Sequence, residues 1–235
     1  MPNDAPALPR PDAILFDLDG TLVDTVWTRI DAWLEALEQS GLPTTSDVLA
    51  PMIGLDGRRL AREVAALAGR PIDEARSEAI DKLSGEIYER LNRPRPLPGV
   101  KEIVAAIAAA DIKWAIATSS RKDQVKTSVD ALGLDAEPTI IDASHVKNAK
   151  PEPDLLLYAA KALDVAPGRC WYVGDSTWDM VSAVAAGMVA IGIEAGSAVG
   201  PEALRSAGAA VVLGDLLELT DVLVKVTAPS AAERR

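Results

Sequence analysis

Six short apolar runs, separated by stretches of helical character, leave few folds open to this chain. The runs are residues 13–16, 114–117, 139–141, 170–173, 189–193 and 210–213. Helix-like stretches such as 99–111, 153–163 and 177–187 lie between them. Strands that alternate with helices favour a parallel sheet covered on both faces, and nearly continuous apolar strands are typical of such a buried sheet. We therefore predict an α/β fold with a doubly wound parallel sheet.

The alternation is interrupted once, between the first and second apolar runs. Residues 26–92 contain no convincing strand, and apolar side chains recur there every three or four positions, as in a helix. They are Trp27, Ile30, Leu34, Leu37, Leu60, Val64, Leu67, Ile80, Leu83, Ile87 and Leu91. The proline-rich segment RPRPLPG, residues 93–99, ends the interruption. We predict a helical domain at 25–95, inserted into a core formed by residues 1–24 and 96–235.

The charge and hydrophobicity of the chain argue against several classes of function. The net charge is −11, whereas a non-specific grip on nucleic acid or an anionic membrane requires clustered Lys and Arg. No apolar stretch approaches the ~20 residues that span a bilayer, and the first residues, MPNDAPALPRP, lack the apolar core of a secretory signal. We expect a cytoplasmic protein, a monomer or a homodimer, that binds neither nucleic acid nor membrane.

Polar and charged residues follow the ends of four of the predicted strands. Ligand sites in open parallel sheets lie beyond the carboxyl ends of the strands, so these residues are expected to meet at one edge. A helix cap or a solvated side chain would explain any one of the four groups, but their combination is improbable by coincidence. The residues are Asp17, Asp19, Thr118, Ser119, Lys150, Asp175 and Asp179.

The chemistry of these residues points to phosphoryl transfer. Asp17, Asp19 and Asp175 offer hard oxygen ligands of the kind that Mg²⁺ prefers, and carboxylates this close repel one another unless a cation lies between them. The hydroxyl of Thr118 and the backbone N–H groups of the turn at Ser119 and Ser120 suit a phosphate, and Lys150 adds a positive charge. A carboxylate can serve as the nucleophile by forming an aspartyl phosphate.

Four segments resemble the four motifs of the haloacid dehalogenase superfamily in their order and approximate spacing. They are FDLDGTLVDT, ATSS, AKPEPD and GDSTWDM, which begin at Phe16, Ala117, Ala149 and Gly174. The inserted helical segment is similar to the cap of the phosphoglycolate phosphatase and β-phosphoglucomutase type. The resemblance covers nearly the whole chain. It implies a Rossmann-like core with a helical cap, and hydrolysis of a small phosphorylated metabolite.

Carried onto this sequence, the resemblance implies a role for each motif residue. Asp17 would be the nucleophile that takes the phosphoryl group. Asp19 would be the general acid that protonates the leaving alcohol and afterwards the base that activates water. Mg²⁺ would be held by Asp17, Asp175 and the backbone carbonyl of Asp19, with Asp179 supporting the metal shell. The phosphoryl oxygens would be bound by Thr118 and Lys150.

Asp19 and Arg29 bear on the choice of reaction. Dehalogenating members of the superfamily lack the second aspartate of the first motif, since a halide leaves without a proton, and Asp19 is present here. β-Phosphoglucomutase-like proteins carry a cap histidine where this chain has Arg29, which favours a hydrolase over the alternative of a sugar phosphate mutase. A phosphoaspartate receiver or binding module is the alternative from a different class, although a receiver domain is usually shorter and has no cap.

Two arginines of the inserted segment are candidates for contacts with the non-reacting end of the substrate. Arg58 follows a loop bracketed by Gly54 and Gly57, and we predict that it contacts a second anionic or polyhydroxyl group, with Arg29 as another candidate. Arginines on a solvated helix start are the plain structural alternative. Trp27, just past the first connection, is expected to pack between cap helices or to line the cleft.

Overall fold

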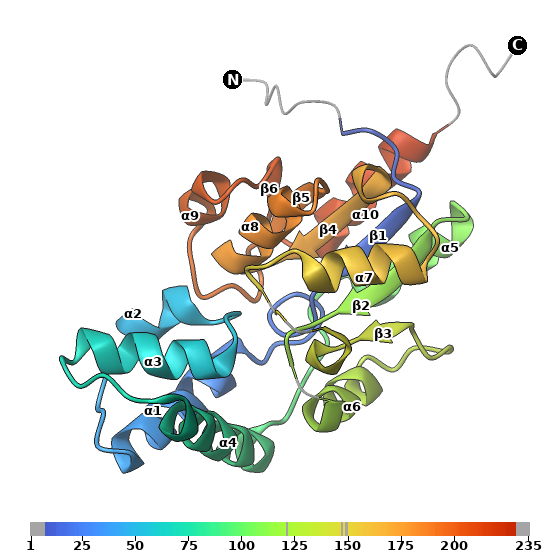
Figure 1. Ribbon diagram of the computed structural model, residues 1–235. Coiled ribbons are helices and arrows are strands. Elements are labelled where there is room, and N and C mark those ends of the chain that lie inside the picture. Colours follow the sequence, from blue (N-terminus) through green and yellow to red (C-terminus); the bar gives the residue numbers. More distant parts are fainter. Residues whose placement is uncertain (1–7, 121, 147, 149, 229–235) are drawn as a thin grey trace, which may run out of the picture.

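The structure, a computed structural model, describes residues 8–120, 122–146, 148 and 150–228. Its centre is a six-stranded sheet in which all neighbouring strands are parallel (Figure 1). The strands are β1 (Ala13–Phe16), β2 (Lys113–Ala117), β3 (Ile140–Ile141), β4 (Cys170–Gly174), β5 (Val189–Ile193) and β6 (Val211–Leu213). Their order is β3-β2-β1-β4-β5-β6, which confirms the predicted Rossmann-like doubly wound fold.

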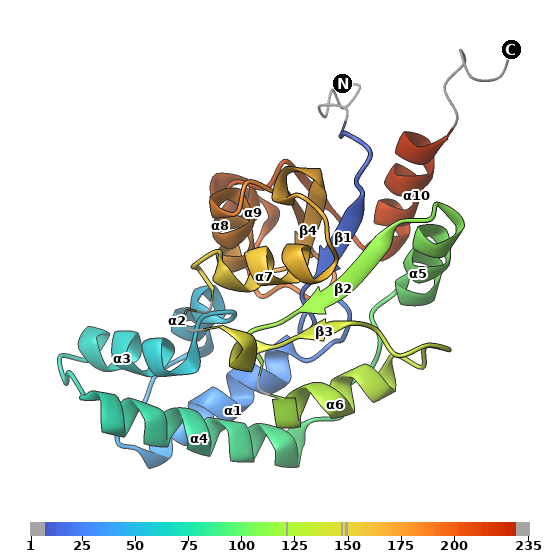
Figure 2. The same ribbon diagram turned by 45° about the vertical axis from the view of Figure 1, so that its right-hand side comes forward.

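Helices cover both faces of the sheet because successive side chains of a strand point to opposite faces. In β1, Ile14 and Phe16 belong to a hydrophobic cluster with residues of α5 (Val100–Ala109), α6 (Lys122–Ala131) and α10 (Leu216–Thr227). Ala13 and Leu15 belong to a second cluster, with residues of α7 (Asp154–Ala162), α8 (Thr177–Ala185) and α9 (Pro201–Ser206). Figure 2 shows α5 and α10 on one side of the strands and α7, α8 and α9 on the other. Short 3-10 helices, η2 (Ala143–His145) and η3 (Pro167–Arg169), precede α7 and β4.

The inserted segment forms a helical cap, as predicted, and the structure gives this cap a hydrophobic cluster of its own. Its elements are α1 (Val26–Gln39), α2 (Ser46–Leu49), η1 (Ala50–Met52), α3 (Gly57–Leu67) and α4 (Glu74–Leu91). Asp56 and Asp73 cap α3 and α4 by accepting hydrogen bonds from backbone N–H groups of the first turn. Ile30, Leu37 and Leu60 are among the buried side chains of the cluster. Figure 1 shows these helices grouped apart from those that cover the sheet.

The prediction for Trp27 is wrong. Its side chain is 55% exposed, so it does not pack between cap helices, and it does not line the cavity described below. The buried side of α1 contains Val26, Ile30 and Trp33, and position 27 lies outside this stripe. The apolar periodicity located the helix correctly but did not identify which of its aromatic residues is buried.

The two connections between cap and core run side by side. The backbone N–H of Asp24 donates to the carbonyl of Arg95 at 2.8 Å, and the N–H of Leu97 donates to the carbonyl of Leu22 at 2.9 Å. A backbone bridge between Val23 and Pro96 joins the same two segments. Because both connections lie at one place, they suit a hinge. The boundaries at 24/25 and 95/96 stay our proposal for the limits of the cap.

No helix among the residues that the structure describes is both long and apolar enough to cross a membrane. Residues 1–7, part of the segment in which we expect no secretory signal, lie outside the described residues.

Candidate active site

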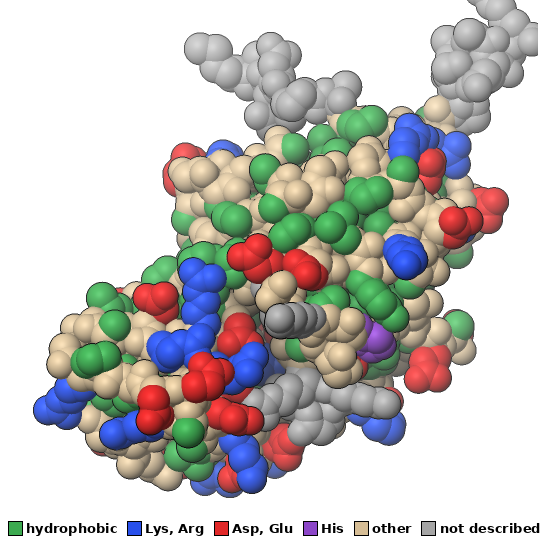
Figure 3. All heavy atoms as spheres, in the orientation of Figure 1, with side chains coloured by type: hydrophobic (Ala, Val, Ile, Leu, Met, Phe, Trp, Pro, Cys, Tyr) green, Lys and Arg blue, Asp and Glu red, His purple; other side chains and the backbone are tan. Residues whose placement is uncertain are grey.

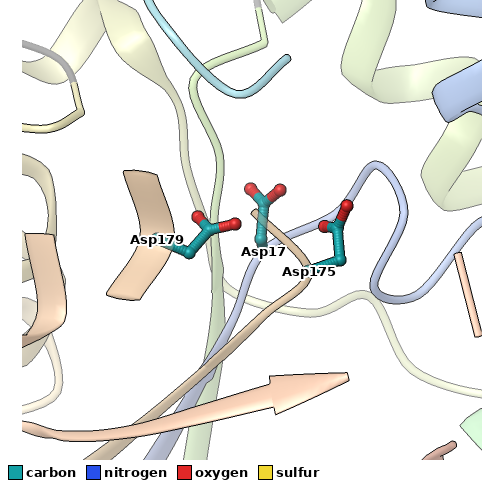
Figure 4. Close-up of side chains that lie close together, drawn as sticks. All are labelled: Asp17, Asp175 and Asp179. Atoms are coloured by element: carbon teal, nitrogen blue, oxygen red, sulfur yellow. The ribbon is translucent and has the colours of Figure 1, made fainter. Parts of the chain in front are cut away.

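Three buried carboxylates meet beyond the carboxyl ends of the two central strands. Asp17 follows β1 and Asp175 follows β4, where the strand order reverses, and Asp179 lies in the first turn of α8. Each offers a carboxylate oxygen within 4.8 Å of the others. Figure 4 shows the three side chains next to one another, with Asp17 in the middle. The structure therefore brings these three of the predicted residues together.

Lys150 is buried beside this group of acids. Its Nζ donates to Oδ1 of Asp17 at 2.7 Å, to Oδ1 of Asp179 at 2.7 Å and to the hydroxyl of Tyr172 at 2.9 Å. Burial alone would lower the pKa of Lys150, but the charges of Asp17 and Asp179 outweigh it, and the pKa of the ammonium is raised. A buried charge is tolerated when it is paired and hydrogen-bonded in this way. Lys150 therefore stays protonated at the base of the site.

A single lysine does not balance the acids around it. Burial raises the pKa of Asp17 to about 7, and repulsion by Asp179 adds to this effect while Lys150 opposes it. Burial and the charges of Asp179 and Asp17 also raise the pKa of Asp175 well above its usual value. The Asp175 carboxylate accepts a hydrogen bond from the Thr21 hydroxyl at 2.9 Å. A buried, all-oxygen donor set with excess negative charge fits a hard divalent cation such as Mg²⁺.

Gly20 explains why the first motif contains a glycine. Its φ of +81° lies in the left-handed region, which favours glycine. A Cβ atom at this position would lie 2.3 Å from Oδ2 of Asp175. A side chain here would therefore displace one of the three acids.

The carboxylate of Asp19 is not part of this acidic group. Its Oδ1 accepts hydrogen bonds from the Thr25 hydroxyl at 2.6 Å and the Tyr88 hydroxyl at 3.1 Å. Its Oδ2 accepts from Nη2 of Arg29 at 2.7 Å and from the Ser120 hydroxyl at 2.6 Å. Burial would raise the pKa of Asp19, but the charge and hydrogen bond of Arg29, with the bonds from Ser120 and Thr25, lower it overall. The structure thus holds Asp19 as an ionised carboxylate beneath the cap.

The residues after β2 bring two hydroxyl groups to the site, and one of them lacks a hydrogen-bond partner among the described residues. Thr118 is buried, and its hydroxyl accepts a hydrogen bond from the backbone N–H of Ser120 at 3.1 Å. The Ser119 hydroxyl is buried and has no hydrogen-bond partner among the residues that the structure describes. Buried polar groups in native proteins are nearly always paired, so an unpaired hydroxyl at this place fits a bound ligand.

A cavity of about 560 Å³ lies between cap and core, and most of the predicted site residues line it. Its lining includes the predicted residues Asp17, Asp19, Arg29, Arg58, Thr118, Ser119, Lys150 and Asp175. Asp179 is fully buried and is not part of the lining. Figure 3 shows acidic and basic side chains gathered on the cap where it faces the core.

The two candidate arginines occupy different environments in this cavity. Arg58 is half-exposed, with ion pairs of 3.5 Å to Asp56 and to Glu74. Arg29 is largely buried: its Nη2 also donates to the Ser120 hydroxyl at 2.7 Å, and its guanidinium lies 4.0 Å from the centre of the Tyr88 ring. Arg58 therefore lies at the wall of the cavity, whereas the charge of Arg29 is directed at Asp19.

Several residues of the site did not stand out in the sequence. Thr25 is the last residue of the first motif and lies six positions after Asp19, so the motif itself pointed to their contact. Tyr88 contacts Asp19 across 69 positions, and Tyr172 contacts Lys150 across 22. No spacing rule connects such pairs, because the contacts depend on how the cap and the strands are placed in space.

Comparison with known proteins finds a matching family and several similar proteins. The sequence profile of the haloacid dehalogenase-like hydrolases matches residues 14–193. The chain is 31% identical over 217 residues to N-acetylmuramic acid 6-phosphate phosphatase of Pseudomonas putida, covering 90% of this chain and 95% of the relative. It is 31% identical over 186 residues to hexitol phosphatase A of Escherichia coli, covering 79% of this chain and 84% of the relative. The crystal structure of a hydrolase from Pseudomonas syringae superposes with a TM-score of 0.85 at 31% identity, covering 91% of this chain and 98% of that hydrolase.

Proposed function

The chain belongs to the haloacid dehalogenase-like hydrolases, and we propose that it hydrolyses a small-molecule phosphate monoester with Mg²⁺, through an aspartyl phosphate on Asp17. Its relatives identify it as a phosphatase of this family. The observation that carries the proposal is the arrangement of Asp17, Lys150 and the unpaired Ser119 hydroxyl around one cavity. A nucleophile, a cation and an anion-binding turn are the groups that phosphoryl transfer requires.

The proposed ligands of Mg²⁺ are the carboxylates of Asp17 and Asp175 and the backbone carbonyl of Asp19. When bound, the ion offsets the negative charge of the phosphoryl oxygens and of the acids. Asp179 is proposed to support the site through its neighbours, because its Oδ1 accepts from Lys150 and Tyr172 and its Oδ2 accepts from Ser176. This network keeps Lys150 next to the nucleophile.

The first chemical step is attack by Asp17 on the phosphorus atom. Oδ1 of Asp17 accepts from Lys150, whereas its Oδ2 accepts no hydrogen bond from the described residues, which leaves Oδ2 for the attack. As the new P–O bond to Asp17 forms, the P–O bond to the leaving alcohol breaks. Asp19 must first take up a proton, since its donors favour the ionised form, and it then gives that proton to the leaving oxygen. Thr118, Ser119 and Lys150 hold the phosphoryl oxygens during the transfer.

The second step releases phosphate and restores the enzyme. Water attacks the phosphorus atom, Asp19 accepts a proton from that water, and the bond between phosphorus and Asp17 breaks. The lowered pKa of Asp19 suits this step because a base must be ionised: burial opposes that form, but Arg29 and the hydroxyls of Ser120 and Thr25 outweigh it.

Arg29 supports hydrolysis over the mutase alternative. It occupies the position at which the resemblance places a mutase histidine, and it is bonded to Asp19 and Ser120. The cap and the donors around Asp19 also support turnover over a phosphoaspartate receiver module, which has no need of a general acid. The names of the relatives favour a phosphorylated sugar acid or polyol, and we propose that Arg58, at the cavity wall, contacts the end of the substrate away from the phosphate.

Phosphate release from a panel of metabolite phosphomonoesters tests the proposed function. The panel includes sorbitol 6-phosphate, N-acetylmuramic acid 6-phosphate and phosphoglycolate, each with Mg²⁺ and with EDTA in its place. We expect release with Mg²⁺ and none with EDTA, because the acids around Asp17 would repel the substrate without a cation. Equal release under both conditions would contradict the proposed metal, and isomerised sugar phosphate without free phosphate would indicate a mutase.

Replacing Asp19 by asparagine is expected to slow hydrolysis according to how much the leaving group needs a proton. For an alkyl phosphate such as sorbitol 6-phosphate we expect kcat to fall by about 10²–10⁴-fold. For p-nitrophenyl phosphate, whose leaving group is stable as an anion, the loss should be clearly smaller. Both substrates meet the same altered contacts to Arg29 and Tyr88. The ratio of their two losses in kcat therefore isolates the proton transfer. An equal loss for both esters would argue against Asp19 as the general acid.

A further inference from the structure

Trp178 lies in the fourth motif, between the acids of the site, yet its side chain contacts the cap. It is in the first turn of α8, in the core, and it packs against the hydrophobic cluster of the cap. Its indole Nε1 donates a hydrogen bond of 2.8 Å to the carbonyl of Pro51, in η1. A core residue is thus anchored to the cap by a contact separate from the hinge at Asp24 and Arg95.

The cap segment that contains this contact also forms one wall of the cavity. Residues 53–58, between η1 and the first turn of α3, all line the cavity. A Cβ atom at Gly54 would lie 2.6 Å from Oγ of Ser176, so the backbone of the segment rests directly on the loop before α8. The guanidinium of Arg59 lies 5.9 Å from the centre of the Trp178 ring, at the outer range of a cation–π contact.

We infer that Trp178 is a specificity-determining positioning residue, which fixes residues 53–58 of the cap over the cavity and so sets the room for the organic part of the substrate. The inference rests on the proposed function, in which a phosphate ester occupies the cavity. The phosphate end meets core residues only, whereas the organic end meets the wall that Trp178 holds in place. Loss of the contact should therefore weaken binding of the organic part and spare binding of phosphate.

The test compares Trp178→Phe, which removes the N–H donor and keeps most of the packing, with Trp178→Ala, which removes both. Trp27→Phe, at the exposed cap position, is the matched control. We expect KM for p-nitrophenyl phosphate to rise about two- to tenfold in Trp178→Phe, the range for one hydrogen bond, and further in Trp178→Ala. The inhibition constant of inorganic phosphate and kcat should stay near their wild-type values. An unchanged KM for p-nitrophenyl phosphate would overturn the inference. An inhibition constant of inorganic phosphate that rises together with KM would also overturn it.

A second measurement does not depend on activity. Hydrogen–deuterium exchange of the backbone should be faster at residues 53–58 in Trp178→Ala than in wild type or Trp27→Phe, because a held segment becomes free to open. Unchanged exchange there would overturn the inference whatever the enzyme hydrolyses. Faster exchange in a protein that releases no phosphate from p-nitrophenyl phosphate would instead reject the proposed function and keep the mechanical role of Trp178.

Discussion

Replacing Asp17 by asparagine is expected to lower kcat for phosphate release by at least about 10⁴-fold, since an amide cannot form the phosphoryl intermediate. The fold should be retained. Burial raises the pKa of Asp17 to about 7, so the folded chain already disfavours the charged form of this side chain. A neutral side chain of the same shape relieves repulsion from Asp175 and Asp179, and Lys150 keeps Asp179 as a partner at 2.7 Å.

Steady-state kinetics test the expected fall in kcat, and thermal unfolding in EDTA of the same preparation tests whether the fold is retained. Asp24→Asn is the matched control, because Asp24 belongs to the same motif and its side chain is exposed. We expect the control to retain wild-type kcat and Asp17→Asn to unfold no earlier than wild type. If Asp17→Asn kept more than about a tenth of wild-type kcat, another group would have to be the nucleophile. A phosphoryl group found by mass spectrometry on Asp17 of acid-quenched wild type would support the intermediate directly.

The fold and the main residues of the site could be predicted because both depend on local patterns. Apolar runs located all six strands to within one residue at each end. Carboxyl ends of parallel strands meet at one edge of a sheet, so residues that follow those ends are brought together without further information. Asp17, Lys150 and Asp175 are neighbours in the structure for this reason, although more than 100 positions separate the first two.

The docking of the cap onto the core could not be predicted in the same way. Arg29 is a candidate for contact with the substrate, and the sequence did not indicate that its guanidinium would lie on Asp19 or that Tyr88 would reach the same carboxylate from α4. The fourth motif gives Trp178 no role of its own, yet it donates to Pro51 across 127 positions. These contacts join elements whose relative placement follows from packing of the whole cap, so no spacing within the sequence reports them.

Replacing Lys150 by methionine is expected to destabilise the protein by about 3–5 kcal/mol in the absence of metal, because two buried carboxylates lose their cation. This loss of stability should grow with pH. Even with Lys150 present, the pKa of Asp17 is raised from 3.8 to about 7 by burial, so the folded chain binds more protons than the unfolded chain between these values. Stability contributed by such a group falls as pH rises through this window. Without the ammonium the pKa of Asp17 would rise further, and the pKa of Asp179, which Lys150 now helps to lower, would rise as well. The deficit relative to wild type is therefore larger at about pH 8 than at about pH 5.

Urea unfolding in EDTA at both pH values measures the deficit, and Lys126→Met is the matched control. Lys126 and Asp130 form an ion pair of 2.7 Å, the same length as the pair of Lys150 with Asp17, but both side chains are exposed. Solvent screening makes the exposed pair weak, so Lys126→Met should unfold like wild type at either pH. An equally small effect of Lys150→Met would show that the acids are neutral or solvated in the metal-free protein. In that case the excess negative charge that supports a Mg²⁺ site would be absent, and the proposed role of Lys150 in holding Asp17 and the phosphoryl oxygens would lose its physical basis.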